Sequence, residues 1–225
     1  MATKPAPPRP VPRLYLATSI VDDPSPLIAS LPALLAGADI AAVLLRLKPT
    51  DPRSMISRIK ALAPIIQNGG AALLLEGNAD LVARSGADGA HLTGIEAMQE
   101  ALPTLKPDRI AGVGGLITRH DSMAAGEAGA DYVLFGEPDG NGHRPSADAV
   151  GERLQWWAEL FEPPCVGFAA AIEEANEFAG AGADFVLVGD FIWADPRGPA
   201  AALMDVSLAI RQGHAMTAKA QAVQG

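Results

Sequence analysis

The sequence has a single cysteine and no long apolar run. With only Cys165 available, no disulfide can form within the chain, and the ordinary role of such a residue is packing. No segment approaches the roughly 20 apolar residues that a membrane-spanning helix needs. The first dozen residues are rich in proline, where a secretory signal would be apolar. We therefore expect a cytoplasmic protein that does not span a membrane.

Basic residues are also scarce. The chain carries 17 Lys and Arg against 26 Asp and Glu, a formal net charge of -9. Binding to nucleic acid or to an anionic membrane needs clustered Lys and Arg, so neither partner is expected. Apolar residues are plentiful, at 49% of 225 positions, which is enough to bury one sizeable core.

The two ends differ in composition from the rest. Residues 1–12 contain five prolines, which fix φ and lack an N–H, so a disordered arm is predicted there. That arm is either a solvated tail or a segment that binds a partner. Residues 213–225 lack an apolar period and are predicted to form a disordered C-terminal tail. One folded domain is expected over residues 13–212.

A Gly-Ala-Asp triplet recurs four times, with its glycine at Gly37, Gly86, Gly129 and Gly182. The intervals of 49, 43 and 53 residues between these positions suit two strand and helix units each, not one. Each triplet follows an Ala-rich helical stretch and precedes an apolar run. This pattern predicts a glycine that ends a helix in the left-handed conformation, just before a buried strand.

The triplets and the apolar runs between them predict eight strands. Their ranges are 13–18, 40–46, 71–76, 89–93, 110–114, 131–136, 164–169 and 185–189. With helices between them, these strands describe a parallel (βα)8 TIM barrel of the α/β class, with a small-molecule ligand at the mouth where the strands end. A doubly wound open sheet is the alternative. Against it, no G-x-G-x-x-G follows the first strand, and the repeat runs through all four quarters.

The chain resembles the thiamine phosphate synthase and thiazole tautomerase family. The resemblance is carried by LYLAT near the start, LLRLK at 44–48, ADLVARSGADGAHL at 79–92, GEAGADYVLFG at 126–136 and AGADFVLVGDFI at 181–192. The block that ends in His91 and Leu92 is the most specific, and the whole covers nearly all of the barrel. The resemblance implies a transferase that joins hydroxymethylpyrimidine diphosphate to a thiazole phosphate as pyrophosphate leaves. It also makes a homodimer an expectation.

The family's substrates imply basic groups and backbone amides that hold phosphates. By position, the substrate- and pyrophosphate-binding residues are Arg46, Lys48, Asn78, Gly136 and Glu137. Arg46 and Lys48 retain the family's charges after the second strand. The alternative is that these two cations simply solvate a loop.

Magnesium is the cofactor that the resemblance implies, and no organic cofactor is implied. Its candidate ligands are Glu76 and Glu96, while Gly77 stands where the family has a ligating aspartate. Because Mg²⁺ demands near-octahedral geometry, the alternative is that Glu76 and Glu96 are two solvated carboxylates at the rim.

Several phosphate-binding positions are altered relative to the family. Ala169 and Ala170 replace a Gly-Gly after the seventh strand, and Asp190 replaces a serine after the eighth. A carboxylate repels phosphate by about 4 kcal/mol at ~4 Å in an effective dielectric of 20. Residues 136–146 replace a threonine-rich loop, and Gly114 stands where the family usually has serine.

His91 is the candidate catalytic residue, and its alternative role is that of a hydrogen-bonded structural group. Two functions therefore stay open. The first is an active transferase of the thiamine phosphate synthase type, which the whole-barrel resemblance supports. The second is a diverged barrel that binds a ligand or regulates without this reaction, which the altered tips favour.

Overall fold

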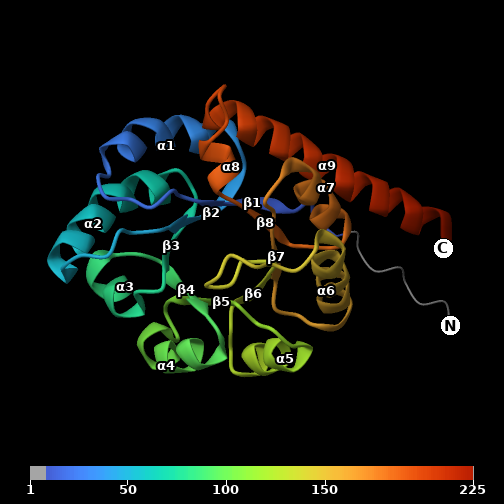
Figure 1. Cartoon of the computed structure of the whole chain (residues 1–225), viewed down its shortest axis with the longest axis horizontal. Coiled ribbons are helices and arrows are strands. Elements are labelled where there is room, and N and C mark those ends of the chain that lie inside the picture. The colour runs from blue at the N-terminus through green and yellow to red at the C-terminus, as the bar shows by residue number, and fades with distance from the viewer. Residues whose placement is uncertain (1–8, 225) are drawn as a thin grey trace.

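Eight parallel strands close into a barrel in sequence order, with β8 bonded to β1 (Figure 1). The computed structural model describes residues 9–224, with side chains through residue 218. The strands are β1 (Arg13–Ala17), β2 (Ile40–Leu45), β3 (Ala72–Glu76), β4 (Gly89–Thr93), β5 (Ile110–Gly114), β6 (Tyr132–Phe135), β7 (Cys165–Phe168) and β8 (Phe185–Val188). The predicted TIM barrel is confirmed and the open sheet is wrong. Every predicted strand agrees to within one residue at each end.

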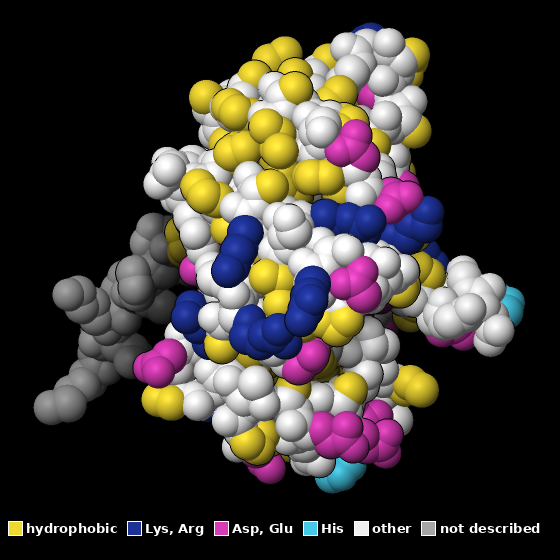
Figure 2. All heavy atoms as spheres, turned by 90° about the vertical axis from the view of Figure 1, so that its left-hand side faces the viewer, with side chains coloured by type: hydrophobic (Ala, Val, Ile, Leu, Met, Phe, Trp, Pro, Cys, Tyr) yellow, Lys and Arg dark blue, Asp and Glu magenta, His cyan; other side chains and the backbone are white. Residues whose placement is uncertain are grey.

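Helices form an outer layer around the strands (Figure 1). They are α1 (Ser25–Gly37), α2 (Pro52–Asn68), α3 (Ala79–Ser85), α4 (Ile95–Leu105), α5 (Arg119–Glu127), α6 (Ala147–Leu160), α7 (Ile172–Gly180), α8 (Asp190–Trp193) and α9 (Pro199–Gln224). Figure 2 shows the side of the molecule that lies at the left in Figure 1, where basic and acidic side chains are interspersed among apolar ones. None of the helices in residues 9–224 combines the length and hydrophobicity that a bilayer span requires.

Two apolar cores lie on the two sides of the strands. The inner core, inside the barrel, consists of Tyr15, Ala17, Leu44, Leu74, Tyr132, Leu134, Val166 and Leu187. The outer core is larger and lies between the strands and the helices. Cys165 belongs to it, and burial raises the pKa of its thiol to about 12, so this residue packs as an uncharged group. The predicted packing role of Cys165 agrees with this environment.

The aspartates of the repeated triplet tie neighbouring strands together. In three of the four copies, the aspartate side chain accepts a hydrogen bond from a backbone N–H in the preceding odd-numbered strand. Asp88 accepts from Leu73, Asp131 from Ala111 and Asp184 from Cys165, at 2.7–2.8 Å. The first copy, Asp39, pairs with Arg13 at 2.8 Å instead. The repeated triplet therefore has a structural role. It lies at the amino end of the barrel, opposite the end where the active sites of TIM barrels are found.

The triplet glycines follow the predicted conformation in three of four copies. Gly86, Gly129 and Gly182 have φ of 81°, 100° and 97°, in the left-handed region. Gly37 does not, because α1 ends on it and the chain becomes extended at Ala38.

The expected C-terminal tail from residue 213 is wrong, because α9 continues as a helix to Gln224. Alanine, glutamine and lysine are good helix formers, so the segment extends the helix without an apolar period of its own. Gly213 also lets α9 approach α7 closely, and Asn176 donates a hydrogen bond to the Ala209 carbonyl at 2.9 Å.

The predicted proline-rich arm lies mostly outside the described residues, which begin at Arg9. The guanidinium of Arg9 donates hydrogen bonds to the carbonyls of Ala158 and Gly182, so this end of the arm is tied to the barrel. Residues 1–8 stay a prediction.

Replacing Gly213 by alanine tests the contact between α7 and α9. The new Cβ would lie 1.9 Å from the Asn176 carbonyl oxygen, so Gly213→Ala should lower the free energy of unfolding by about 1–3 kcal/mol. Gly37→Ala is the matched control, because its Cβ meets nothing within 4 Å and helix propensity favours alanine by up to about 1 kcal/mol. Urea unfolding of both variants measures the difference. Equal stabilities would contradict the close helix contact.

Candidate functional site

A cavity of about 610 Å³ opens where the strands end. Leu44, Leu134 and Leu187 of the inner core form its apolar floor. The polar and charged residues that line it are Arg46, Glu76, Thr93, Glu137, Asp139, His143, Arg153 and Asp190. These residues come from several different strand tips, as expected of the ligand site of such a barrel.

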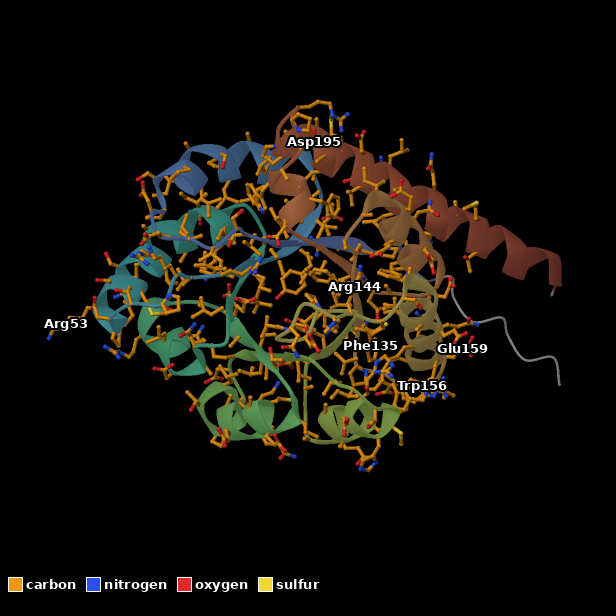
Figure 3. The ribbon with its side chains drawn as sticks, viewed as in Figure 1. Arg53, Phe135, Arg144, Trp156, Glu159 and Asp195 are labelled. Atoms are coloured by element: carbon orange, nitrogen blue, oxygen red, sulfur yellow. The ribbon has the colours of Figure 1, made fainter. Side chains whose placement is uncertain are left out.

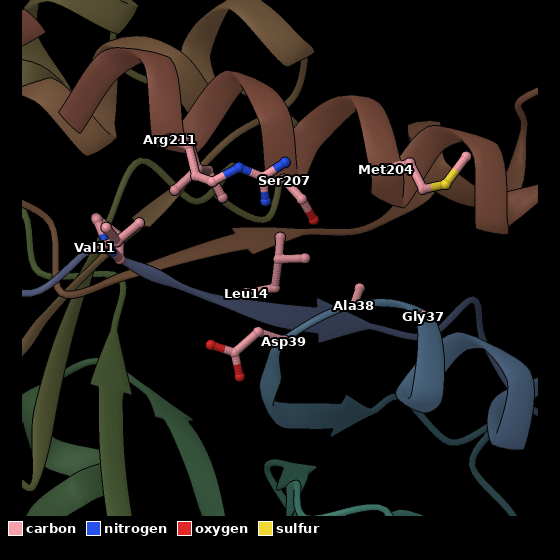
Figure 4. A pocket seen from close by; sticks show the side chains of 10 residues that line it. Val11, Leu14, Gly37, Ala38, Asp39, Met204, Ser207 and Arg211 are labelled. Atoms are coloured by element: carbon pink, nitrogen blue, oxygen red, sulfur yellow. The ribbon is translucent and has the colours of Figure 1, made fainter. Parts of the chain in front are cut away.

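A second cavity, of about 550 Å³, lies at the amino end of β1 beside α9 (Figure 4). Val11, Leu14, Asp39, Ser207 and Arg211 are among the residues that line it. None of the predicted site residues does.

The structure separates the two predicted pyrophosphate cations. Arg46 lines the cavity, where its Nη1 lies 3.0 Å from Asp190 and its Nε 3.4 Å from Glu76. The buried Nε has no hydrogen-bond partner among the described residues. Lys48 does not line the cavity and pairs with Asp22 at 2.6 Å, a hydrogen bond that lowers the pKa of this aspartate. Of the two predicted cations, Arg46 is therefore the one that lines the cavity, and two carboxylates of the protein flank it.

The two candidate magnesium ligands lie in different surroundings. Glu76 faces the cavity beside Arg46, whereas Glu96 is exposed in the first turn of α4 and does not line the cavity. Asn78 has φ of 46° and donates its side-chain N–H to the Glu76 carbonyl at 2.9 Å. Within the described part of the chain, no three His, Cys, Asp or Glu residues are grouped to hold a metal. These residues do not fit a resident magnesium ion.

The amides at the tip of β7 are hydrogen-bonded within the chain. The N–H of buried Ala169 donates to the Leu187 carbonyl at 2.9 Å. The N–H of Ala170 donates to Oε2 of Glu174 at 2.8 Å. The Glu174 carboxylate thus accepts the hydrogen bond of the Ala170 N–H, at the position where the family resemblance implies a bound phosphate.

Arg144 holds the same carboxylate from the other side. Its Nη1 donates to both Glu174 oxygens at 2.9 Å, and its Nε and Nη2 donate to the carbonyls of Gly136 and Phe168 at 3.1 and 3.0 Å. Figure 3 shows Arg144 on the inner side of α6, toward the barrel. Sequence reasoning missed both residues. Arg144 lies in a remodelled loop, and an acidic residue in the first turn of a helix is too common to be a signal.

His91 lies inside the barrel, with 2% of its surface exposed. Its Nδ1 lies 2.9 Å from the Tyr132 hydroxyl, and its Nε2 lies 2.9 Å from Oε1 of Glu137. The Tyr132 hydroxyl also lies 2.9 Å from that of Tyr15. Its surroundings are those of the hydrogen-bonded structural group, and a catalytic role for His91 stays a prediction.

Glu137 and Gly114 are sterically coupled. The Glu137 carboxylate accepts the Gly115 N–H at 3.0 Å, through Oε2. A Cβ on residue 114 would lie only 1.7 Å from that oxygen. The glycine found where the family usually has serine therefore makes room for a glutamate, a relation that neither position reveals by itself.

Known proteins resemble this chain in sequence and in fold. The model of the thiamine monophosphate synthase family matches residues 14–192. The thiamine-phosphate synthase of Rhodospirillum centenum is 39% identical over 203 residues, which are 88% of this chain and 98% of that protein. That of Hyphomonas neptunium is 35% identical over 215 residues, 89% of this chain and 95% of the relative.

Solved structures agree on the fold. Thiamine phosphate pyrophosphorylase from Pyrococcus furiosus superposes with a TM-score of 0.74 at 20% identity, covering 89% of this chain and 96% of that one. The 3-hexulose-6-phosphate synthase from Salmonella typhimurium gives a TM-score of 0.69 at 17% identity, covering 90% and 100%. At these identities the likeness concerns the barrel alone.

The coupling between residues 114 and 137 is measurable by a double-mutant cycle. Gly114→Ala should destabilise the protein by about 1–3 kcal/mol, because the Glu137 carboxylate has to move away from the new Cβ and gives up the hydrogen bond from the Gly115 N–H. In a Glu137→Ala background the same substitution should cost at least about 1 kcal/mol less. Urea unfolding of the four proteins gives the coupling energy. An identical cost in both backgrounds would contradict the steric relation.

Proposed function

The chain belongs to the thiamine monophosphate synthase family, and from this premise we propose that its cavity binds an unphosphorylated pyrimidine or thiazole ring. One observation carries the proposal: the Glu174 carboxylate occupies the Ala170 amide and the Arg144 guanidinium. These groups do not line the cavity themselves, but Arg144 donates to the carbonyls of the lining residues Gly136 and Phe168, so a ligand phosphate that reaches this tip from the cavity has to displace Glu174. Hydrogen bonds to charged groups contribute about 1.5–3 kcal/mol each, so the displacement is costly.

The charges around Arg46 support the same conclusion. Glu76 and Asp190 flank its guanidinium, so a diphosphate approaching Arg46 meets two carboxylates. Because Glu76 and Asp190 are 49% and 80% exposed, water screens their repulsion, and their main effect is to offset the charge that Arg46 offers to an anion. The uncharged part of a substrate meets no such barrier, because the floor of the cavity is apolar.

No step of this proposal depends on a metal. Glu76 is next to Arg46, Gly77 offers no side chain, and Glu96 lies outside the cavity. A homodimer, a cytoplasmic location and the absence of a nucleic-acid partner stay predictions.

The second candidate is the family's condensation of hydroxymethylpyrimidine diphosphate with thiazole phosphate. It is favoured by the retention of Arg46 in the cavity and by a relative named thiamine-phosphate synthase of which the alignment covers 98%. This reaction requires Arg46 to turn from Asp190 toward the leaving diphosphate. It also requires Arg144 to exchange Glu174 for the thiazole phosphate.

Calorimetry distinguishes the two candidates. We expect saturable heat with 5-(2-hydroxyethyl)-4-methylthiazole, and none up to millimolar concentration with its phosphate or with pyrophosphate plus Mg²⁺. Micromolar binding of either phosphate compound would overturn the proposal and favour the condensation.

Removing the Glu174 carboxylate should create phosphate binding. In Glu174→Ala, the Ala170 amide and the Arg144 guanidinium are free to hold an anion, so the affinity for thiazole phosphate should rise at least tenfold, about 1.4 kcal/mol. The control is Glu173→Ala, which removes the neighbouring, exposed carboxylate in the same helical turn. If a folded Glu174→Ala protein binds thiazole phosphate no better than the control does, then Glu174 is not the group that excludes it.

A further inference from the structure

We propose that Glu137 selects a cationic heterocycle, such as a thiazolium ring, over a neutral one. This inference rests on the proposed function and names its ligand class more narrowly. Glu137 lines the cavity just after β6, and 19% of its side chain is exposed. The carboxylate is therefore largely removed from water yet open to a ligand.

Two hydrogen-bonding groups hold the Glu137 carboxylate. Oε2 accepts the Gly115 N–H at 3.0 Å, and Oε1 lies 2.9 Å from His91 Nε2. Among the described residues, no Lys or Arg makes an ion pair with Glu137.

The two inner tyrosines determine the direction of the hydrogen bonds on the two sides of His91. The Tyr15 hydroxyl is buried, and Tyr132 is its hydrogen-bond partner. Only one direction of donation gives every proton an acceptor: Tyr15 donates to Tyr132, Tyr132 to His91 Nδ1, and His91 Nε2–H to Glu137. Burial raises the pKa of both tyrosines, so each keeps its proton.

The opposite direction leaves the Tyr15 proton without an acceptor among the described residues of the barrel interior. The Glu137 carboxylate is therefore held in place by hydrogen bonds from His91 and from the Gly115 N–H.

The remainder of the cavity suits a flat cation. Arg46 and Arg153 are its two basic lining residues, against the four acidic residues Glu76, Glu137, Asp139 and Asp190. Arg46 lies between two of these carboxylates, and Arg153 donates to the carbonyls of Leu116 and Ile117. Leu44, Leu134, Leu187 and Phe168 offer apolar and aromatic surface to a ring. Among the described lining carboxylates, Glu137 and Asp139 have no Lys or Arg partner, and Glu137 is the more buried of the two, 19% exposed against 54%.

The test compares thiamine, which carries a permanent thiazolium charge and no phosphate, with neutral 5-(2-hydroxyethyl)-4-methylthiazole. Calorimetry on the full chain should show thiamine binding at least tenfold more tightly. Glu137→Gln should remove at least tenfold of the thiamine affinity and change the affinity for the neutral thiazole less than twofold. Glu137→Asp, which keeps the charge, should retain the preference and guards against a loss caused by altered folding.

Glu100→Gln is the matched control, since this glutamate is exposed on α4 away from the cavity, and it should change neither affinity. Neutral thiazole binding without a preference for thiamine would overturn the selectivity of Glu137 alone. A Glu137→Gln protein with unchanged thiamine affinity would do the same. If neither ring binds, the proposed function fails as well.

Discussion

Carboxylates that accept backbone N–H groups hold three pairs of neighbouring strands together at the amino end of the barrel. Asp88, Asp131 and Asp184 each accept the amide of a residue in the preceding odd-numbered strand, and the backbone N–H of each aspartate donates to the carbonyl of that same residue. Two bonds between the same pair of residues fix the register where a strand begins. Since a shift of one residue would exchange the inner and outer faces, these pairs also determine which side chains point into the barrel.

The same chemistry recurs at the opposite end, with a different effect. At the mouth, carboxylates again bind groups of the chain itself: Glu174 binds Arg144 and an amide, and Asp190 binds Arg46. In a barrel that binds a phosphate, guanidinium groups and backbone amides donate to the ligand. Here the protein supplies the anions, and Glu137 is a cavity carboxylate that has no Lys or Arg partner among the described residues. Acidic side chains therefore outnumber Lys and Arg in the lining of the mouth.

Sequence reasoning was strongest where a pattern repeats. The four triplets and the apolar runs between them predicted all eight strands, since buried parallel strands have a simple composition. It also identified Arg46, Glu76, Glu137 and Asp190 as residues near the mouth. It did not reveal the Arg144–Glu174 pair or the His91–Tyr132–Tyr15 order, because these are contacts between distant strands and loops. The end of α9, from residue 213, was missed because it has no clear apolar period, although its residues favour a helix.

The glycine at position 114 also constrains how this mouth can change. With Glu137 present, any side chain at 114 collides with the carboxylate, and a serine there is incompatible with the present position of the glutamate. A side chain at position 114 fits only if the glutamate turns away from the Gly115 N–H. A change at residue 114 therefore alters the orientation of the carboxylate that residue 137 presents to the cavity, although residue 114 does not line the cavity itself.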